Sequence, residues 1–365
     1  MRLSGYSLTN LIKIDGSILE GGGAILRNAV SLSAIFQKPM EIYNIRAKRS
    51  TPGLRSQHAH VIRAIAQLSN GETEGVKVGS EKIRFYPQKL QGGEYTIDVV
   101  TAGSLSLLLM AIFPVAALAK SPVTLHLRGG TDVKWAPPID YMKYVYLPMM
   151  EKIGVKANLV IKRRGHYPKG GGLIDCEIQL AQDLNTINYQ LDEDKPFAID
   201  CICGRAHAVK LPKHVVERMT SAAAQKLKQY NYNVGIIEEE WLESKQNGPL
   251  GPGAGITLWA CTNYDTIIAG DGLGERGLPA EKVGQTAAQN LIEQLEIGRP
   301  IDYHLADQLI VWMGLSSQPS VIDTTKITLH TLTNIEIIKK FVNVSFEVQG
   351  KQGEPGIIRC HPLDK

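Results

Sequence analysis

A carboxylate, three glycines and an arginine lie close together near the start of the sequence. Glu20 precedes the run Gly21 to Gly23, and Arg27 follows one helical turn later. Exposed amides at the start of a helix favour a bound anion, and the carboxylate is able to hold a metal or to position a hydroxyl. No Gly-Lys-Ser/Thr follows, so the segment is not a P-loop. The alternative is a tight turn in which Glu20 caps the helix.

A basic loop is the second candidate for phosphate contacts. Four cations lie between positions 46 and 55, and the polar residues Gln57 and His58 follow at the expected start of a helix. An arginine offers a planar fork of donors to phosphate oxygens, and one proline and one glycine restrict the shape of the loop. We therefore expect Arg46 and Arg49 to contact phosphate or an RNA backbone, with a solvated surface run as the alternative.

The segment from Thr328 to Asn334 places a histidine among hydroxyl side chains. We expect a strand near 326–329, the histidine at its end, and a helix that begins at Thr333 or Asn334, either of which suits an N-cap. A neutral imidazole is a competent nucleophile near pH 7, so His330 is the candidate to attack a phosphorus atom. The alternative is a histidine at the edge of the core that is hydrogen-bonded to threonine.

Polar residues also begin a further expected helix at His304 to Gln308. Asp307 and Gln308 either contact a nucleotide or cap the helix and face solvent. The residues themselves do not decide between the two.

Two patterns that suggest other chemistry are weaker. Lys13-Ile14-Asp15-Gly16 matches the KxDG string of lysine-adenylating ligases, but the supporting downstream motifs are missing, so we expect the end of a strand and a turn. His58 and His60 are two residues apart, which on a helix places them about 200° apart, so we expect no shared metal. The sequence has no HExxH motif and no Cys/His zinc spacing.

These candidate residues lie in loops between strand-like and helix-like segments. The first such run is a strand at 12–14, the glycine loop and a helix that reaches Phe36. Similar glycine loops at 128–132 and 167–172 indicate one supersecondary unit used more than once. We expect the cations Lys162 to Arg164, with Lys169, to add to the basic surface.

The polarity of the chain changes near residue 185. The stretch 185–196 is polar, and strand and helix patterns that could form an independent module follow it. Later segments resemble the N-terminal part again. We therefore predict an inserted small α/β domain at 185–296 within a discontinuous catalytic domain at 1–184 plus 297–365.

The composition is that of an ordinary soluble globular protein. Of the 365 residues, 44% are hydrophobic and 21% are charged. The net charge of +4 is too small to indicate nucleic-acid binding by itself. The apolar run at 105–119 is about 15 residues long, whereas a membrane span needs roughly 20, so we expect a buried helix and no membrane partner. Five cysteines without a CxxC pair, and no expected signal peptide, predict a cytoplasmic protein.

Seven motifs follow one another in a characteristic order: EGGGAILR, IRAKRSTPGLRSQH, TAGS, RGGTDV-x-x-APP, YPKGGG, ADQL and TLHTLTNI. Together they resemble the RNA 3′-terminal phosphate cyclase family, over nearly the whole chain and least within residues 185–290. The resemblance implies an α/β (α+β) fold. Its large domain consists of repeated βαβαββ-type units related to enolpyruvyl transferases, and a smaller α/β domain is inserted.

The resemblance also implies a reaction and its participants. An RNA 3′-terminal phosphate becomes a 2′,3′-cyclic phosphate in an ATP-dependent reaction that passes through AMP-histidine and RNA-(3′)pp(5′)A and releases pyrophosphate and AMP. The partner is RNA with a 3′-phosphate, the cofactors are ATP and a divalent metal, Mg or Mn, and the oligomeric state is left open.

The family's nucleophile falls on His330, and the other functional positions are carried over with it. The implied residues are Glu20, Arg27 and His58 for catalysis, Glu20 for the metal, His304, Leu305, Ala306, Asp307 and Gln308 for ATP, and Arg46, Arg49 and Gln57 for RNA or phosphate. Two positions depart from the family pattern. His304 stands where many relatives carry tyrosine, and Met110 stands where bacterial members have a glutamine that contacts ATP.

Two alternatives remain. One is a noncatalytic relative that acts in ribosome assembly, although such relatives lack the histidine that is present here. The other is an enolpyruvyl transferase with the same repeats, which would not depend on ATP.

Overall fold

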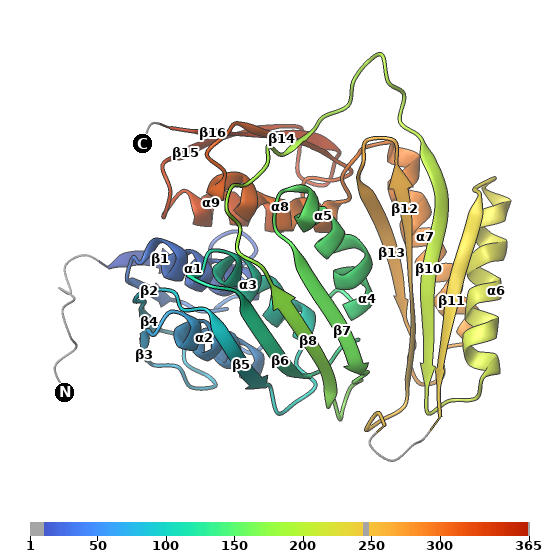
Figure 1. The fold of residues 1–365 in the computed structure, drawn as a ribbon, viewed down its shortest axis with the longest axis horizontal. Helices are drawn as coiled ribbons and strands as arrows, with labels where there is room; N and C mark the ends of the chain where they lie inside the picture. Colours follow the sequence, from blue (N-terminus) through green and yellow to red (C-terminus); the bar gives the residue numbers. More distant parts are fainter. Residues whose placement is uncertain (1–10, 244–247, 364–365) are drawn as a thin grey trace.

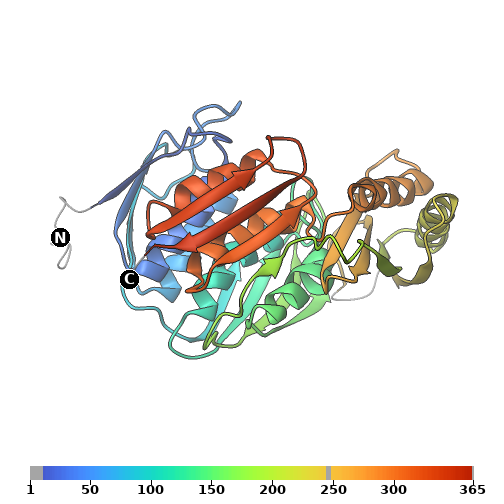
Figure 2. The same cartoon turned by 90° about the horizontal axis from the view of Figure 1, so that it is seen from above.

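The structure is a computed structural model that describes residues 11–243 and 248–363. The remaining parts of the predicted domain ranges, 1–10, 244–247 and 364–365, lie outside the described residues. Strands in the described part form four sheets (Figure 1). Figures 1 and 2 show that three of the sheets surround a common set of helices, while the fourth sheet and its two helices lie at one end of the molecule.

The first unit has the strand order β1-β2-β4-β3. Strands β1 and β2 are parallel, and β4 pairs antiparallel with both β2 and β3. Its elements are β1 Ile12–Asp15, α1 Gly23–Phe36, β2 Met40–Tyr43, α2 Ser56–Leu68, β3 Glu72–Glu74 and β4 Ile83–Tyr86.

The second unit repeats this arrangement. Its order is β5-β6-β8-β7, with β5 and β6 parallel and the other pairs antiparallel. Its elements are β5 Gly93–Asp98, α3 Leu105–Ala117, β6 Val123–Gly129, α4 Ile139–Tyr141, a π-helical segment Met142–Tyr146, α5 Leu147–Lys152, β7 Ala157–Arg163 and β8 Gly172–Ile178.

The third unit has the same pairing but is interrupted in sequence. Strand β9 pairs parallel with β14, which pairs antiparallel with β16, and β16 pairs antiparallel with β15. Its elements are β9 Asn188–Tyr189, α8 Tyr303–Leu315, β14 Ser320–Thr324, α9 Leu329–Ile338, β15 Val344–Gln349 and β16 Gly356–Pro362.

A separate α/β layer lies between β9 and α8 in the sequence. Its sheet has the order β11-β10-β12-β13, and helices α6 and α7 pack on it around a second hydrophobic core. Its elements are β10 Ile199–Val209, α6 His214–Gln229, β11 Val234–Leu242, β12 Gly253–Thr262, β13 Ile267–Leu273 and α7 Ala280–Ile297.

The expected fold class, a mixed α/β fold of repeated units, is confirmed by the recurring strand order. The domain boundaries stay a prediction. Strand β9, inside the predicted range 185–296, pairs with β14 of the third unit. A strand of two residues is too short to show an alternating pattern, so β9 could not be predicted from periodicity.

The expected strand near 326–329 is wrong. The strand lies earlier, at β14, and α9 already begins at Leu329. Thr328 is its N-cap, because its hydroxyl accepts a hydrogen bond from the Thr331 amide. A threonine-rich run suits either a strand or a helix start, so its composition alone could not place the boundary.

The apolar run at 105–119 forms α3, as expected, and nearly all of this helix is buried in the main core. Ser104 caps its first turn by accepting a hydrogen bond from the Leu107 amide. Among the residues that the structure describes, no helix is both long and apolar enough to cross a membrane.

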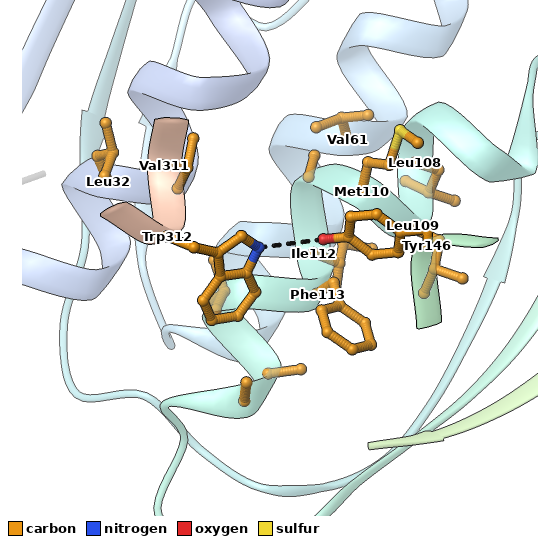
Figure 3. Packing of buried hydrophobic residues seen from close by; sticks show 14 of the residues in the cluster. Leu32, Val61, Leu108, Leu109, Met110, Ile112, Phe113, Tyr146, Val311 and Trp312 are labelled. Atoms are coloured by element: carbon orange, nitrogen blue, oxygen red, sulfur yellow. Dashed lines mark hydrogen bonds between the residues drawn. The ribbon is translucent and has the colours of Figure 1, made fainter. Parts of the chain in front are cut away.

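Trp312 of α8 anchors the contact between the second and third units (Figure 3). Its indole N–H donates to the Tyr146 hydroxyl at 3.3 Å, and its ring packs edge-on against Phe113 at 6.0 Å between centroids.

We expect Trp312→Ala to lower the free energy of unfolding by about 3–5 kcal/mol, because it leaves a large cavity in the core. Chemical denaturation measures this, with Trp135→Ala as the matched control. Trp135 is 95% exposed, so its removal should cost less than about 0.5 kcal/mol, and equal losses in the two variants would contradict the packing described.

Candidate active site

Two segments about 300 residues apart in sequence meet at the starts of α1 and α9. One Glu20 carboxylate oxygen, Oε1, lies 3.1 Å from Nη2 of Arg49 and 3.7 Å from Nδ1 of His330. The Glu20 amide donates to the Thr333 hydroxyl at 3.3 Å, which ties the glycine loop to α9. The sequence-predicted carboxylate and histidine therefore lie in one site.

His330 is in the first turn of α9, and not at the end of a strand as expected. Its side chain is 49% exposed, whereas the side chain of Glu20 is only 6% exposed. The carboxylate is thus held within the protein and the imidazole faces solvent, where a substrate can reach it.

The glycine loop lets these side chains approach the backbone closely. Gly21 has a positive φ of 59°, and its neighbour Gly22 donates its amide hydrogen to Glu20 Oε2 at 2.7 Å. A Cβ on Gly22 would lie 1.9 Å from Glu20 Oε1, and a Cβ on Gly23 would lie 2.6 Å from His58 Nε2. The glycines are therefore required by the packing of the site, in addition to any tight turn.

The Arg27 guanidinium lies beside the same glycines, 3.1 Å from the position that a Gly23 Cβ would occupy. Removal from water lowers the pKa of Arg27 to about 10, and the nearby Glu20 carboxylate opposes this shift. Arg27 therefore remains a cation at pH 7.

His58 is buried at the start of α2 and is neutral at pH 7. Burial, together with the positive charges of Arg27, Arg46 and Arg55, lowers its pKa to about 3. Its Nδ1 accepts a hydrogen bond from the Arg55 amide at 3.2 Å, so the proton is on Nε2, which faces the glycine loop. His58 is thus a neutral donor among cations.

The basic loop divides into residues that support it and residues that face the site. Arg46 donates to the carbonyl oxygens of Thr51 and Gly53 at 2.8 and 2.9 Å, so part of its guanidinium braces its own loop. Arg49 is exposed and reaches Glu20. Gln57 accepts a hydrogen bond from the Ser104 amide at 3.2 Å, which joins the starts of α2 and α3.

The segment 304–308 contributes unevenly to the site. Leu305 and Ala306 are fully buried in the main core, whereas His304 is exposed, with its ring 4.0 Å from that of Tyr303. Gln308 is half-buried. Met110, the other departure from the family pattern, is also buried in the main core.

Asp307 holds the start of α9. Its Oδ1 accepts hydrogen bonds from the hydroxyls of Thr328 and Thr331, both at 2.5 Å, and its carbonyl oxygen accepts from Asn334 at 2.8 Å. Burial raises the pKa of Asp307 to about 6, although the two hydroxyls oppose this. Asp307 thus makes its hydrogen bonds to α9, the helix that carries His330.

We expect Thr328→Val to lower the free energy of unfolding by about 0.5–2 kcal/mol, because it removes the N-cap of α9 and leaves one hydrogen bond to Asp307 unmade. Thr328→Ser keeps the hydroxyl and serves as the matched control. Urea denaturation of both variants measures the effect. A serine variant that is destabilised as much as the valine variant would show that the methyl group matters and the cap does not.

The starts of five helices meet in this site. Glu20 links α1 to α9, His58 packs against the start of α1, Gln57 links α2 to α3, and Asp307 links α8 to α9. Helix N-termini present free amides and a partial positive charge. With the nearby arginines, they form surroundings that suit several phosphate groups.

One part of the expected basic surface is wrong. Arg164 is fully buried and ion-paired with Asp132, Asp140 and Glu240, the last of which lies on β11 of the inserted layer. Local sequence could not show this, since two of its partners precede it by 24 residues or more and the third lies 76 residues downstream.

Among the described residues, one group of three side chains could hold a metal ion: Asp132, His166 and His207. All three are buried, and burial lowers the pKa of both histidines, which are therefore neutral. The sequence search missed this group because its members come from three distant segments and form no spaced motif. A cavity of ≈ 420 Å³ adjoins Asp132 and is lined by none of the sequence-predicted site residues.

The fold and the site together define a protein of three repeated α/β units, with a histidine, a carboxylate and arginines gathered at helix N-termini. The family model for RNA 3′-terminal phosphate cyclase matches residues 18–348. The chain therefore belongs to the RNA 3′-terminal phosphate cyclase family, and the expected family and enzyme class are confirmed.

Curated relatives agree with this over almost their whole length. The chain is 45% identical to the RNA 3′-terminal phosphate cyclase of Korarchaeum cryptofilum, covering 95% of this chain and 97% of the relative. It is 42% identical to the RNA 3′-terminal phosphate cyclase of Methanopyrus kandleri, with 97% and 99% covered. A solved structure, the enolpyruvyl transferase NikO from Streptomyces tendae, matches with a TM-score of 0.27 at 11% identity, over 94% of this chain and 64% of that one. A likeness this low carries no argument here.

Proposed function

We propose that the chain converts an RNA 3′-terminal phosphate to a 2′,3′-cyclic phosphate at the expense of ATP. Family membership supports the RNA substrate. The observation that carries the proposal is the position of His330, half-exposed at the start of α9 and 3.7 Å from the Glu20 carboxylate. A solvent-facing imidazole next to a carboxylate and cations is suited to attack on phosphorus.

The proposed reaction has three steps. In the first, the lone pair of His330 Nε2 attacks the α-phosphorus of ATP, and the bond to the β-phosphate oxygen breaks to release pyrophosphate. Next, an oxygen of the RNA 3′-phosphate attacks the same phosphorus and takes AMP from the imidazole. Finally, the ribose 2′-oxygen attacks the RNA phosphorus, loses its proton, and AMP leaves.

Glu20 supports the choice of Nε2 as the attacking atom. Nδ1 faces the carboxylate, so a proton on Nδ1 is favoured there and the lone pair remains on Nε2. Glu20 also stabilises the positive charge that the imidazole gains when it forms the bond to phosphorus.

The cations and helix N-termini are assigned to the phosphate groups. Arg27 and Arg49 flank the glycine loop and would stabilise charge that develops on the triphosphate. We assign Gln57 and the free nitrogens of Arg46 to the RNA 3′-phosphate, and the neutral His58 to a hydrogen bond from Nε2 to a phosphate oxygen.

For the nucleotide we assign the ring of His304, which lies 4.0 Å from that of Tyr303, as a stacking surface for the base. Lys326 Nζ lies 4.5 Å from the centroid of the Tyr303 ring, so a cation is close to this surface. Leu305 and Ala306 could contribute only backbone groups, because their side chains are in the core. Asp307 is proposed to act through α9, as a positioning residue for His330.

A divalent metal fits the site only with help from the substrate. Glu20 supplies one carboxylate, and Mg²⁺ in nucleotide sites is commonly held by one or two carboxylates together with phosphate oxygens. Such an ion would supply charge neutralisation on the triphosphate. The cytoplasmic location stays a prediction.

The test is an RNA oligonucleotide with a labelled 3′-terminal phosphate, incubated with the purified chain, ATP and Mg²⁺ or Mn²⁺. The proposal expects the label to become resistant to phosphatase only when ATP is present. Resistance without ATP would contradict the proposed chemistry. If the label stays sensitive to phosphatase under all conditions although the protein is folded, the noncatalytic alternative is favoured.

A further inference from the structure

Three metal-binding side chains meet where the layer β10–β13 contacts the second unit. Asp132 follows β6, His166 follows β7, and His207 lies on β10. Their exposed fractions are 2%, 4% and 2%, so each is almost completely removed from solvent. None of them belongs to the site around His330.

The ligand atoms form a compact triangle. Nε2 of His166 lies 3.0 Å from Nε2 of His207, and each of these atoms lies 3.9 Å from Asp132 Oδ2. The point in the plane of the three atoms that is equidistant from them is about 2.1 Å from each, which is the usual distance of zinc from histidine nitrogen and carboxylate oxygen.

The packing holds the two rings in this orientation. A Cβ on Gly253 would lie 2.1 Å from the His166 ring, and a Cβ on Gly255 would lie 2.9 Å from His207 Cε1. Strand β12 therefore leaves room for both imidazoles by carrying glycine at the two positions that face them. The other ring nitrogen of His207, Nδ1, lies 3.9 Å from Asp140 Oδ2. A carboxylate therefore lies behind this ligand, as in many metal sites.

The local charge also favours a cation. Asp132 and Asp140 are buried together, and Glu240 joins them with a side chain that is 19% exposed. Arg164 is the fully buried cation that contacts all three carboxylates. Arg205, at 3.2 Å from Glu240, is shared with Glu238 and lies toward the surface. Negative charge therefore remains in excess in the buried part of the cluster, which is costly unless a cation balances it.

Hydrogen bonding alone leaves the cluster incompletely satisfied. Asp132 Oδ1, His166 Nδ1 and His207 Nδ1 are buried and have no hydrogen-bond partner. If the two neutral rings only bonded to each other, one Nε2–H would donate to the other Nε2 and both Nδ1 atoms would remain unused. None of these three atoms is one of the ligand atoms: an ion on Oδ2 and the two Nε2 atoms would keep a proton on each Nδ1, that of His207 toward Asp140 Oδ2 at 3.9 Å.

We propose that Asp132, His166 and His207 bind one Zn²⁺ ion. Two imidazoles and one carboxylate select zinc over Mg²⁺, which prefers oxygen ligands. The adjoining cavity of ≈ 420 Å³, which Asp132 lines, gives a route for the ion and space for a water as fourth ligand. The ion links the second unit to β10 and so fixes the inserted layer on the large domain. It is separate from any metal that accompanies ATP.

The test measures zinc in the full-length chain without ATP or RNA. Purified protein is loaded with Zn²⁺, dialysed against metal-free buffer and analysed for metal per chain by mass spectrometry. We expect about one zinc in the wild type and in the control His361→Gln, whose histidine is exposed on β16, and less than a tenth of that in His207→Gln and His166→Gln. Equal zinc in the wild type and His207→Gln would overturn the proposal.

Two further measurements on the wild type need no variant. Adding a strong chelator is expected to lower the Tm of the loaded protein, because an ion that binds only the folded state stabilises it. Co²⁺ added to the metal-free protein is expected to give the visible absorption of a four-coordinate site. An unchanged Tm together with no such absorption would overturn the proposal even if the histidine variants fail to fold.

Discussion

Replacing His330 with alanine is expected to reduce cyclisation by at least about 10³-fold, to the background rate. In the proposed reaction the imidazole forms a covalent bond to AMP. Removal of a nucleophile usually lowers the rate about as much as removal of all the catalytic residues that act with it. No other histidine contacts the Glu20 carboxylate in the described part of the chain. Turnover of 3′-phosphorylated RNA at saturating ATP measures the effect.

The control for this prediction is His361→Ala, which removes an exposed histidine on β16. It should retain the wild-type rate. His330→Ala should also keep its fold, because the side chain is half-exposed and its removal leaves the Thr328 cap in place. A folded His330→Ala protein that still cyclises RNA at a tenth of the normal rate or more would remove His330 as the nucleophile.

The second large effect is expected at Arg27. Its guanidinium lies partly buried beside Gly23, so in the proposed reaction it would meet the triphosphate already oriented and partly desolvated. Loss of one such preorganised charge typically costs about 10²–10³-fold in rate. We expect Arg27→Ala to slow the formation of AMP-protein by this factor in a single turnover. Arg27→Lys should recover only part of it, because lysine lacks the planar fork of donors.

Arg63→Ala is the matched control, since Arg63 is an exposed arginine on α2 that donates to the Val76 carbonyl oxygen. It should leave the single-turnover rate unchanged. If Arg27→Ala raises only the ATP concentration needed for half-saturation and leaves the maximal rate intact, then Arg27 binds the ground state and does not stabilise the transition state.

Local sequence patterns predicted the helices and most strands because these depend on neighbouring residues. The glycine loop, α1 and α3 lie where periodicity and the apolar run placed them. The start of α9 does not lie where the sequence pattern placed it, because hydroxyl residues favour a strand and a helix cap alike. Asp307, on another helix, stabilises the helix start by accepting hydrogen bonds from the hydroxyls of Thr328 and Thr331. Contacts between distant elements determine such boundaries.

The candidate site shows the same limit. Residue type and the ordered motifs indicated Glu20, Arg27, His58 and His330, which the structure brings together. Residue type and motif order could not show that Leu305 is buried in the core while its neighbour His304 is exposed. The buried group at Asp132 was invisible to the sequence because each member taken alone is an ordinary polar residue in a loop or strand.

The central claim is that AMP is transferred covalently to His330, and incubation with α-labelled ATP and a divalent metal tests it most directly. After denaturing electrophoresis, we predict a labelled protein band whose label is lost in acid, is stable in alkali and maps to the peptide that contains His330. Addition of 3′-phosphorylated RNA should discharge the label. Folded wild-type protein that takes up no label, or that carries it on another residue, would contradict the account.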